Sequence, residues 1–225
     1  MSKGLLIDIT QCVGCGACRV ACTEANKLPE SDGNELSDER YTVVQEKTVS
    51  NGEVRNVRKL CMHCLSPTCA SVCPVGAFTR TEEGPVLYDE NKCIGCRYCQ
   101  VSCPYEARAF NWWKPRHEGS FKKSLNSDVS VMSRGTIVKC TFCSHIWKRE
   151  RDKAVAQGIT DINAVLYTPT CASSCPTGAI VFGDLNDPDS EVSKLSKDKR
   201  AFRLVHTIDE KPEDEKKRLM HLKDY

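Results

Sequence analysis

The sixteen cysteines fall into four sets of four, and their spacing constrains this chain more than any other feature. The first and third sets share the spacing CxxCxxCxxxC, the second widens one gap by two residues, and the fourth is split by an interval of 27 residues. The four sets are Cys12, Cys15, Cys18 and Cys22; Cys61, Cys64, Cys69 and Cys73; Cys93, Cys96, Cys99 and Cys103; and Cys140, Cys143, Cys171 and Cys175. No cysteine is left over, so one chemistry has to account for all four sets.

The short spacing within the sets is typical of cubane 4Fe-4S clusters. A CxxCxxC segment turns tightly enough to present three thiolates to one cluster while its backbone N–H groups face the sulfurs. Gly14, Gly16 and Gly95 lie inside such turns, where a positive φ or a close approach to the cluster would exclude a Cβ. The last cysteine lies beyond the turn, and in two-cluster ferredoxins it binds the neighbouring cluster. The sets are therefore expected to work in pairs.

The intervals between sets predict which sets pair. Only 19 residues separate Cys73 from Cys93, whereas 38 separate Cys22 from Cys61 and 36 separate Cys103 from Cys140. Sets two and three should pair, which leaves set one for set four. Exchange of the last cysteine within each pair then gives four complete sites. These are site 1 (Cys12, Cys15, Cys18 and Cys175), site 2 (Cys140, Cys143, Cys171 and Cys22), site 3 (Cys93, Cys96, Cys99 and Cys73) and site 4 (Cys61, Cys64, Cys69 and Cys103).

Similar segments around the sets predict an α+β fold built from two ferredoxin-like modules that are related by an internal repeat. Leu6–Asp8 precedes the first set as Leu87–Asp89 precedes the third, and both segments favour a short strand that enters a cluster loop. Pro74–Phe78 and Pro176–Ile180 indicate matching turns that lead into strands after the closing cysteines. Each module should bind two clusters.

The repeats also suggest the domain boundaries. Residues 1–55 and 111–185 are expected to form an outer module from the two chain arms, and residues 56–110 a central module. Ile146–Gly158 has the pattern of an amphipathic helix that ends at a glycine and packs on the outer module. Residues 186–225 form a charged tail, whose part from Asp209 to Tyr225 favours a solvated or partner-wrapping helix.

Composition narrows the class of protein and of partner. With 40% hydrophobic and 28% charged residues, the chain is typical of a globular protein, and no apolar run approaches the roughly 18 residues of a membrane span. The N-terminus lacks the apolar stretch of a signal peptide. The formal net charge of +2 argues against a nucleic-acid partner. Each cubane with its four thiolates adds about −2, so four clusters would bring the charge to about −6 and give nearby cations a role.

Three alternatives use the same cysteines. Structural zinc also takes CxxC pairs, but it does not call for repeated CxxCxxCxxxCP runs in complete fours. A disulfide scaffold does not suit thiols two residues apart in tight turns of a long chain. A soluble enzyme that uses one cluster on its substrate would leave one iron without a cysteine, whereas every site here has four. We therefore predict electron transfer and assign no catalytic residue.

Several residues near the cysteines have two interpretations. His63 and His145 are expected to pack and donate hydrogen bonds, with ligation or proton transfer as the alternatives. Trp112 and Trp113 suit core packing and partner contact equally. Five basic residues flank the cysteine ligands. They either raise the reduction potentials of the clusters or are ordinary surface charge, and for any single residue surface charge is the favoured interpretation. They are Arg19, Lys92, Arg97, Arg108 and Lys139.

Four segments, of which one includes the first two cysteines of the fourth set, carry a family resemblance: Ala109–Trp112, Leu125–Val131, Arg134–Cys143 and Phe182–Pro188. Together with the cysteine sets, they resemble the four-cluster ferredoxin-type subunits of the complex iron-sulfur molybdoenzyme family over about residues 1–185. The nearest branch has a quinone-reactive membrane partner of the polysulfide reductase type and includes the menaquinone reductase complex and alternative complex III. Ser127 departs from the proline frequent in that branch, and this change leaves the ligands untouched.

The resemblance implies an electron-transfer subunit with four 4Fe-4S clusters, of which an exposed one that loses an iron would be isolated as 3Fe-4S. Its implied partners are a large molybdopterin-type or related subunit, or a multihaem cytochrome c, and a quinone-reactive integral membrane subunit. The outer module would face the large subunit and the central module the membrane subunit. Formate dehydrogenase and sulfur-compound reductase complexes are alternative settings. The family suggests a peripheral complex on the periplasmic side, exported with a partner, with the cytoplasmic side as the alternative.

Anaerobically purified protein should contain about sixteen iron and sixteen sulfide per chain, because each of four sites takes four of each. It should be brown, and elemental analysis by plasma mass spectrometry should find no stoichiometric zinc. Four zinc ions per chain would contradict the cluster prediction.

Overall fold

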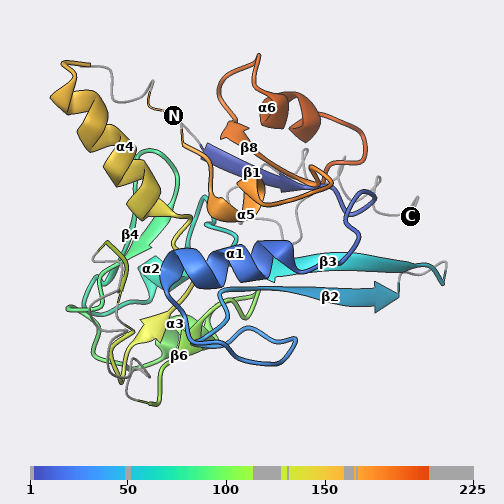
Figure 1. The fold of residues 1–225 in the computed structure, drawn as a ribbon. Coiled ribbons are helices and arrows are strands. Elements are labelled where there is room, and N and C mark those ends of the chain that lie inside the picture. The colour runs from blue at the N-terminus through green and yellow to red at the C-terminus, as the bar shows by residue number, and fades with distance from the viewer. Residues whose placement is uncertain are drawn as a thin grey trace, which may run out of the picture.

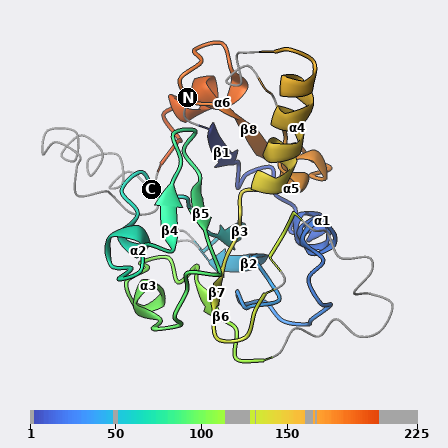
Figure 2. The same ribbon diagram turned by 90° about the vertical axis from the view of Figure 1, so that its left-hand side faces the viewer.

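The structure is a computed structural model that describes residues 3–48, 52–113, 128–130, 132–159, 165 and 167–202. Within these ranges, short helices and two-stranded antiparallel sheets surround the cysteine loops (Figures 1 and 2). The strand pairs are β1 (Lys3–Ile7) with β8 (Ile180–Asp184), β2 (Thr42–Thr48) with β3 (Val54–Leu60), β4 (Phe78–Arg80) with β5 (Val86–Tyr88), and β6 (Ala109–Phe110) with β7 (Ile137–Val138). The helices are α1 (Ala17–Asn26), α2 (Thr68–Ser71), α3 (Tyr98–Val101), α4 (Ser144–Ala156), α5 (Thr170–Ser173) and α6 (Glu191–Ser196).

The two chain arms meet in the sheet of β1 and β8. Lys3 lies opposite Asp184 and Ile7 opposite Ile180, so the first strand of the chain pairs with one that follows the fourth cysteine set (Figure 1). Helix α1 packs against α5 beneath this sheet. The strands expected near Leu6 and after Pro176 are therefore present, and they hold the first and fourth cysteine sets together.

A similar arrangement surrounds the second and third sets. Strand β4 leaves the loop after Cys73 and pairs with β5, which enters the loop that begins at Cys93. Helices α2 and α3 pack against each other (Figure 2). A backbone hydrogen bond of 2.9 Å from Lys3 to Glu83 joins the two arrangements at one edge.

The hairpin of β2 and β3 is an element that the sequence analysis did not predict. Its strands pair along their whole length, from Thr42 opposite Leu60 to Thr48 opposite Val54. The expected boundary between residues 55 and 56 falls inside β3, so the chain passes from the outer to the central segment without a break. Strand β3 carries three basic residues, which hide its buried positions in a plain hydrophobicity pattern.

Each of three small hydrophobic cores contains cysteine side chains. Cys69 and Cys99 pack with Val86 and Ile137 in one core. Cys22 packs with Leu28, Tyr41, Met132 and Val138 in the second, and Cys18 and Cys171 pack with Ile180 in the third. The interior of the fold and its cysteine sites therefore share the same side chains.

The helix expected over Ile146–Gly158 is present as α4, which begins two residues earlier and ends at Ala156. Gly158 follows it with a φ of 77°, a conformation that a glycine adopts without strain. Figure 1 shows α4 at one side of the molecule, and its buried residues are His145 and Ala154. The tail from Asp209 to Tyr225 and the segment from Leu125 to Ser127 lie outside the described residues.

None of the helices in the described ranges combines the length and the apolar character needed to cross a bilayer.

Replacing Gly95 with alanine should destabilise the fold more than replacing Gly76. Both glycines have positive φ, at 71° and 60°, so each alanine carries a backbone strain of about 1–2 kcal/mol. A Cβ on Gly95 would also lie 2.3 Å from the carbonyl oxygen of Gly135, whereas nothing lies within 4 Å of a Cβ on Gly76. Urea unfolding of the two holoproteins measures the difference. Equal losses would show that the backbone contact at Gly95 relaxes at no cost.

Candidate functional site

The four cysteine loops share one backbone feature at the second residue after the first cysteine. This residue has a positive φ in every loop: 73° at Gly14, 46° at His63, 71° at Gly95 and 59° at Phe142. The sequence predicted this for the two glycines and missed the two aromatic residues. Backbone N–H groups also face sulfur as predicted, for example from Gly95 to Cys93 and from Phe142 to Cys140, both at 3.4 Å.

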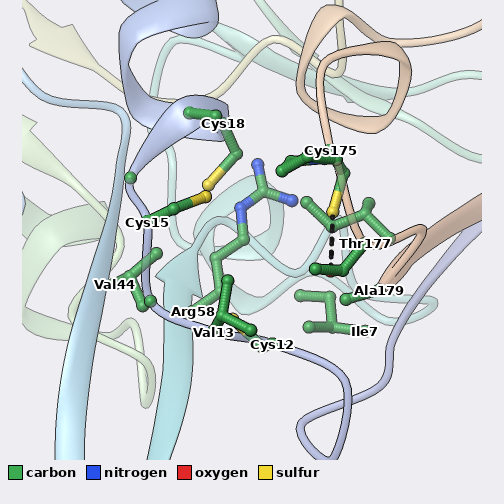
Figure 3. A pocket seen from close by; sticks show the side chains of 15 residues that line it. Ile7, Cys12, Val13, Cys15, Cys18, Val44, Arg58, Cys175, Thr177 and Ala179 are labelled. Atoms are coloured by element: carbon green, nitrogen blue, oxygen red, sulfur yellow. Dashed lines mark hydrogen bonds between the residues drawn. The ribbon is translucent and has the colours of Figure 1, made fainter.

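The cysteines of site 1 line one hollow. Its walls also include Ile7, Val13 and Val44 and the side chain of Arg58, which reaches in from β3. Figure 3 looks into this hollow and shows the Arg58 guanidinium among the labelled cysteines. The cysteines that line it are Cys12, Cys15, Cys18 and Cys175.

The cysteines of site 2 line a second hollow on the other side of Arg58. Leu5, Leu60 and Pro169 complete its apolar wall. Burial raises the pKa of the Cys22 thiol well above its usual value, and the three other site 2 cysteines raise it further. The four cysteines that line the hollow are Cys22, Cys140, Cys143 and Cys171.

Cys69 of site 4 and Cys99 of site 3 belong to the core that contains Val86, and Cys73 and Cys93 of site 3 pack against it. Burial raises the pKa of Cys64 to about 11, and the nearby charges that add to it are the other three cysteines of site 4. Burial likewise raises the pKa of Cys99 to about 12, against the opposing charge of Arg108, and Cys93 and Cys73 of site 3 contribute. Cys96 lies exposed in the loop between Cys93 and Cys99. The structure thus places Cys64 near the three other cysteines of site 4, and Cys99 near Cys93 and Cys73 of site 3.

The contacts between sites arrange them in the order 1, 2, 4, 3. Arg58 lines the hollows of both site 1 and site 2. Site 2 adjoins site 4, because the Phe142 ring in the loop of site 2 lies 4.7 Å from the His63 ring in the loop of site 4. Site 4 adjoins site 3 through Cys69 and Cys99, which share one core. The two cysteines classed as exposed, Cys15 and Cys96, belong to sites 1 and 3, the two ends of this order.

Three basic side chains are buried among the cysteines: Arg58, Arg108 and Lys139, with exposed fractions of 3%, 6% and 4%. The favoured interpretation of Arg108 and Lys139 as surface charge is therefore wrong. Arg58 was missed, because β3 carries several basic residues and nothing in the sequence distinguishes the buried one. Its Nε donates to the Thr42 hydroxyl at 2.8 Å, which fixes it within the hairpin.

The other flanking cations lie at the surface, where ordinary surface charge was expected. Arg19 donates to the carbonyl of Gly33 at 3.2 Å, and Lys92 lies 3.9 Å from Asp89. The Arg97 guanidinium stacks over the Phe110 and Trp112 rings. Trp112 and Trp113 are 52% and 67% exposed, so neither is a core residue within this chain.

His63 is fixed in one orientation beside site 4. The backbone N–H of Val86 donates to its Nδ1 at 3.0 Å, so a proton on the neutral ring has to be on Nε2. The ring lies 4.7 Å from that of Phe142, and burial lowers the pKa of the imidazole. His63 interacts with the Cys61 thiol and lowers its pKa. The ring thus packs against Phe142 and accepts a hydrogen bond at Nδ1, as the expected packing role requires, and hydrogen-bond donation from Nε2 stays a prediction. His145 is also buried, in the first turn of α4, and burial lowers its pKa.

Buried polar atoms at these sites suit an anionic cluster. Among the described residues, Arg58 Nη1, Arg108 Nε and His63 Nε2 are buried without a hydrogen-bond partner. All sixteen cysteines carry free thiols. No three Cys, His, Asp or Glu side chains in the described ranges lie close enough to share one metal ion, and the thiols of sites 1 and 2 line hollows instead. Thiolate sulfurs spaced around a hollow, with unpartnered donors beside them, fit a 4Fe-4S cluster.

The comparison with protein families matches residues 53–120 to the 4Fe-4S dicluster domain. This segment contains the second and third cysteine sets in full, Cys61 to Cys103.

Three relatives match nearly the whole chain. The menaquinone reductase iron-sulfur cluster-binding subunit of Nitratidesulfovibrio vulgaris is 43% identical over 220 residues, which is 93% of this chain and 86% of the relative. A putative iron-sulfur subunit of dimethyl sulfoxide reductase from Halobacterium salinarum is 34% identical, over 94% and 76% of the two chains. The first iron-sulfur subunit of the Hdr-like menaquinol oxidoreductase from Archaeoglobus fulgidus is 36% identical, over 83% and 67%.

Proposed function

The chain belongs to the family of iron-sulfur subunits of oxidoreductase complexes, and from this premise we propose that it carries electrons between two partner subunits through four 4Fe-4S clusters. Each bound cluster supplies reversible one-electron chemistry without bond formation, so electrons pass from one cluster to the next. The chain's own residues hold the clusters, shield them from water and set their potentials. One observation carries the proposal: the four cysteine sites follow one another in a single order, with an exposed cysteine at each end.

The ligands of each cluster are proposed to be the cysteines of sites 1 to 4. The two hollows support sites 1 and 2, since each hollow is lined by all four cysteines of one site. The dicluster match supports sites 3 and 4, because a segment with two clusters contains all eight of their cysteines. Exchange of the last cysteine is supported by Cys22, whose thiol neighbours belong to the fourth set, and by Cys64, whose neighbours include Cys103.

We further propose that the chain consists of two ferredoxin-like modules related by an internal repeat. In the outer module, β1 pairs with β8 and α1 packs on α5. In the central module, β4 pairs with β5 and α2 packs on α3. The hairpin of β2 and β3 joins the two modules, and Arg58 of β3 lines the hollow of site 1 although it lies beyond residue 55. The modules are therefore better defined by their cysteine sites than by boundaries at residues 55 and 110.

The partners are proposed from the family and from the two ends of the site order. Two of the relatives are named for menaquinone or menaquinol, which supports a quinone-reactive membrane subunit at the end of the central module. The dimethyl sulfoxide reductase relative supports a large molybdopterin-type subunit at the outer end, where Cys15 is exposed. A multihaem cytochrome c is the alternative partner. A peripheral position on the periplasmic side of the membrane completes the proposal.

Paired cysteine substitutions test the ligand sets. Cys103→Ser combined with Cys64→Ser should remove no more iron than either change alone, about four atoms per chain, because both residues serve site 4. Cys103→Ser combined with Cys96→Ser should remove about eight, because Cys96 serves site 3. Iron analysis and low-temperature EPR of the reduced proteins provide the counts. The opposite result would place Cys103 with its own set and contradict the exchange.

Isolation of the native complex tests the function. A tagged chain should co-purify with a membrane subunit, and menaquinol should reduce part of its clusters, seen as bleaching of the brown absorbance. A matched sample with a quinone-site inhibitor should show no bleaching. A chain that isolates alone from solubilised membranes with all its iron would contradict the subunit assignment.

A further inference from the structure

One buried cation lies at each of the three junctions between successive sites. Arg58 lines the hollows of sites 1 and 2, and the thiolates that raise its pKa against burial belong to both. Lys139 donates to the carbonyl of Cys140 at 2.9 Å and interacts with Cys61 and Cys69. Arg108 interacts with Cys61 and Cys69 of site 4 and with Cys99 of site 3. The three cations therefore alternate with the four sites.

Arg108 makes the most direct contact with ligand sulfur. Its Nη1 donates to Cys61 Sγ at 3.1 Å, and its Nη2 donates to Cys69 Sγ at 2.7 Å. Both are hydrogen bonds from a cation to sulfur, and both acceptors belong to site 4. One guanidinium thus bridges two of the four thiolates of a single site.

The position of Arg108 is fixed by its surroundings. The guanidinium lies over the Phe78 ring, 5.2 Å from the centroid, and only 6% of the residue is exposed. A surface arginine would swing into water and be screened, whereas this one stays in the interior, where the effective dielectric constant is low. Its charge is therefore screened less at site 4 than that of an exposed arginine would be.

Site 4 also has two further favourable neighbours. Lys139 is buried beside Cys61, and the hydrogen-bond donor of the His63 ring is fixed on Nε2 by the contact of Nδ1 with Val86. Arg108 and Lys139 are therefore both buried beside site 4, and Arg108 contacts two of its sulfurs directly.

We propose that Arg108 is a positioning residue that raises the reduction potential of site 4. The inference rests on the proposed electron-transfer function. With a cluster held there, reduction would add one negative charge to site 4, the electron would come from an adjoining cluster that is oxidised in the same step, and no bond would form or break. The guanidinium stabilises that added charge, and hydrogen bonds to sulfur and nearby positive charge are known to raise such potentials.

Redox titration of Arg108→Gln tests the proposal. The full chain in its complex is titrated anaerobically at controlled potential, and its clusters are followed by EPR. One midpoint potential should be lowered. At a given potential the ratio of reduced to oxidised cluster should then fall at least about tenfold, which is equivalent to 59 mV. Arg108→Lys keeps the charge without the fork of two donors, so its midpoint should lie between those of Arg108→Gln and the unchanged protein.

Arg97→Gln is the matched control, since Arg97 is an exposed arginine stacked over Phe110 and Trp112. The four midpoint potentials of the Arg97→Gln protein should be unchanged. Arg58→Gln should shift the midpoint potentials of the outer-module clusters and leave that of site 4 unchanged. Full iron with unaltered midpoints in Arg108→Gln would overturn the proposal. If Arg108→Gln loses iron, the titration of Arg108→Lys tests the proposal in its place. A lowered midpoint of site 4 in Arg108→Lys supports the proposal, and an unchanged midpoint overturns it. If the protein without any substitution contains no iron, the proposed function is contradicted, which is a different outcome from a failure of this inference.

Discussion

Burial of thiolate sulfur is the constraint on which the rest of this structure depends. Sixteen sulfurs have to converge in fours inside a chain of 225 residues, and each loaded site carries about two negative charges into a medium of low dielectric constant. Backbone N–H groups at the tight turns offset part of that charge, as at Gly95 and Phe142. The buried cations Arg58, Arg108 and Lys139 offset a further part.

The same constraint explains how a fold with so little regular structure is held together. An isolated two-stranded sheet is marginally stable in water, and such pairs are the sheets found in the described residues. Their hydrophobic cores are small, and each includes cysteines, such as Cys69 beside Val86 and Cys18 beside Ile180. Cluster binding and folding are therefore linked, because a cluster joins segments that few other contacts hold together.

The cysteine sites could be predicted from the sequence because their geometry is mostly local. Spacing alone indicates which turns present three thiolates, and the short interval between Cys73 and Cys93 indicates the pairing. The buried cations could not be found in this way. Arg58 reaches sites 1 and 2 only because β3 pairs with β2 across them, and the burial of Arg108 depends on the packing of Phe78 from another strand. Such contacts arise from tertiary structure, and they cannot be predicted from the type of a residue or from its neighbours in the sequence.

The two interior loops differ from the two terminal ones in a way that bears on electron transfer. At the position where sites 1 and 3 have glycine, sites 4 and 2 have His63 and Phe142, each with a positive φ that costs a residue with a Cβ about 1–2 kcal/mol. Strained conformations of this kind persist where the surrounding structure enforces them. Here the two rings lie 4.7 Å apart at the junction between sites 2 and 4. The two rings therefore occupy this junction beside the buried Lys139, whose field is stronger there than at an exposed site.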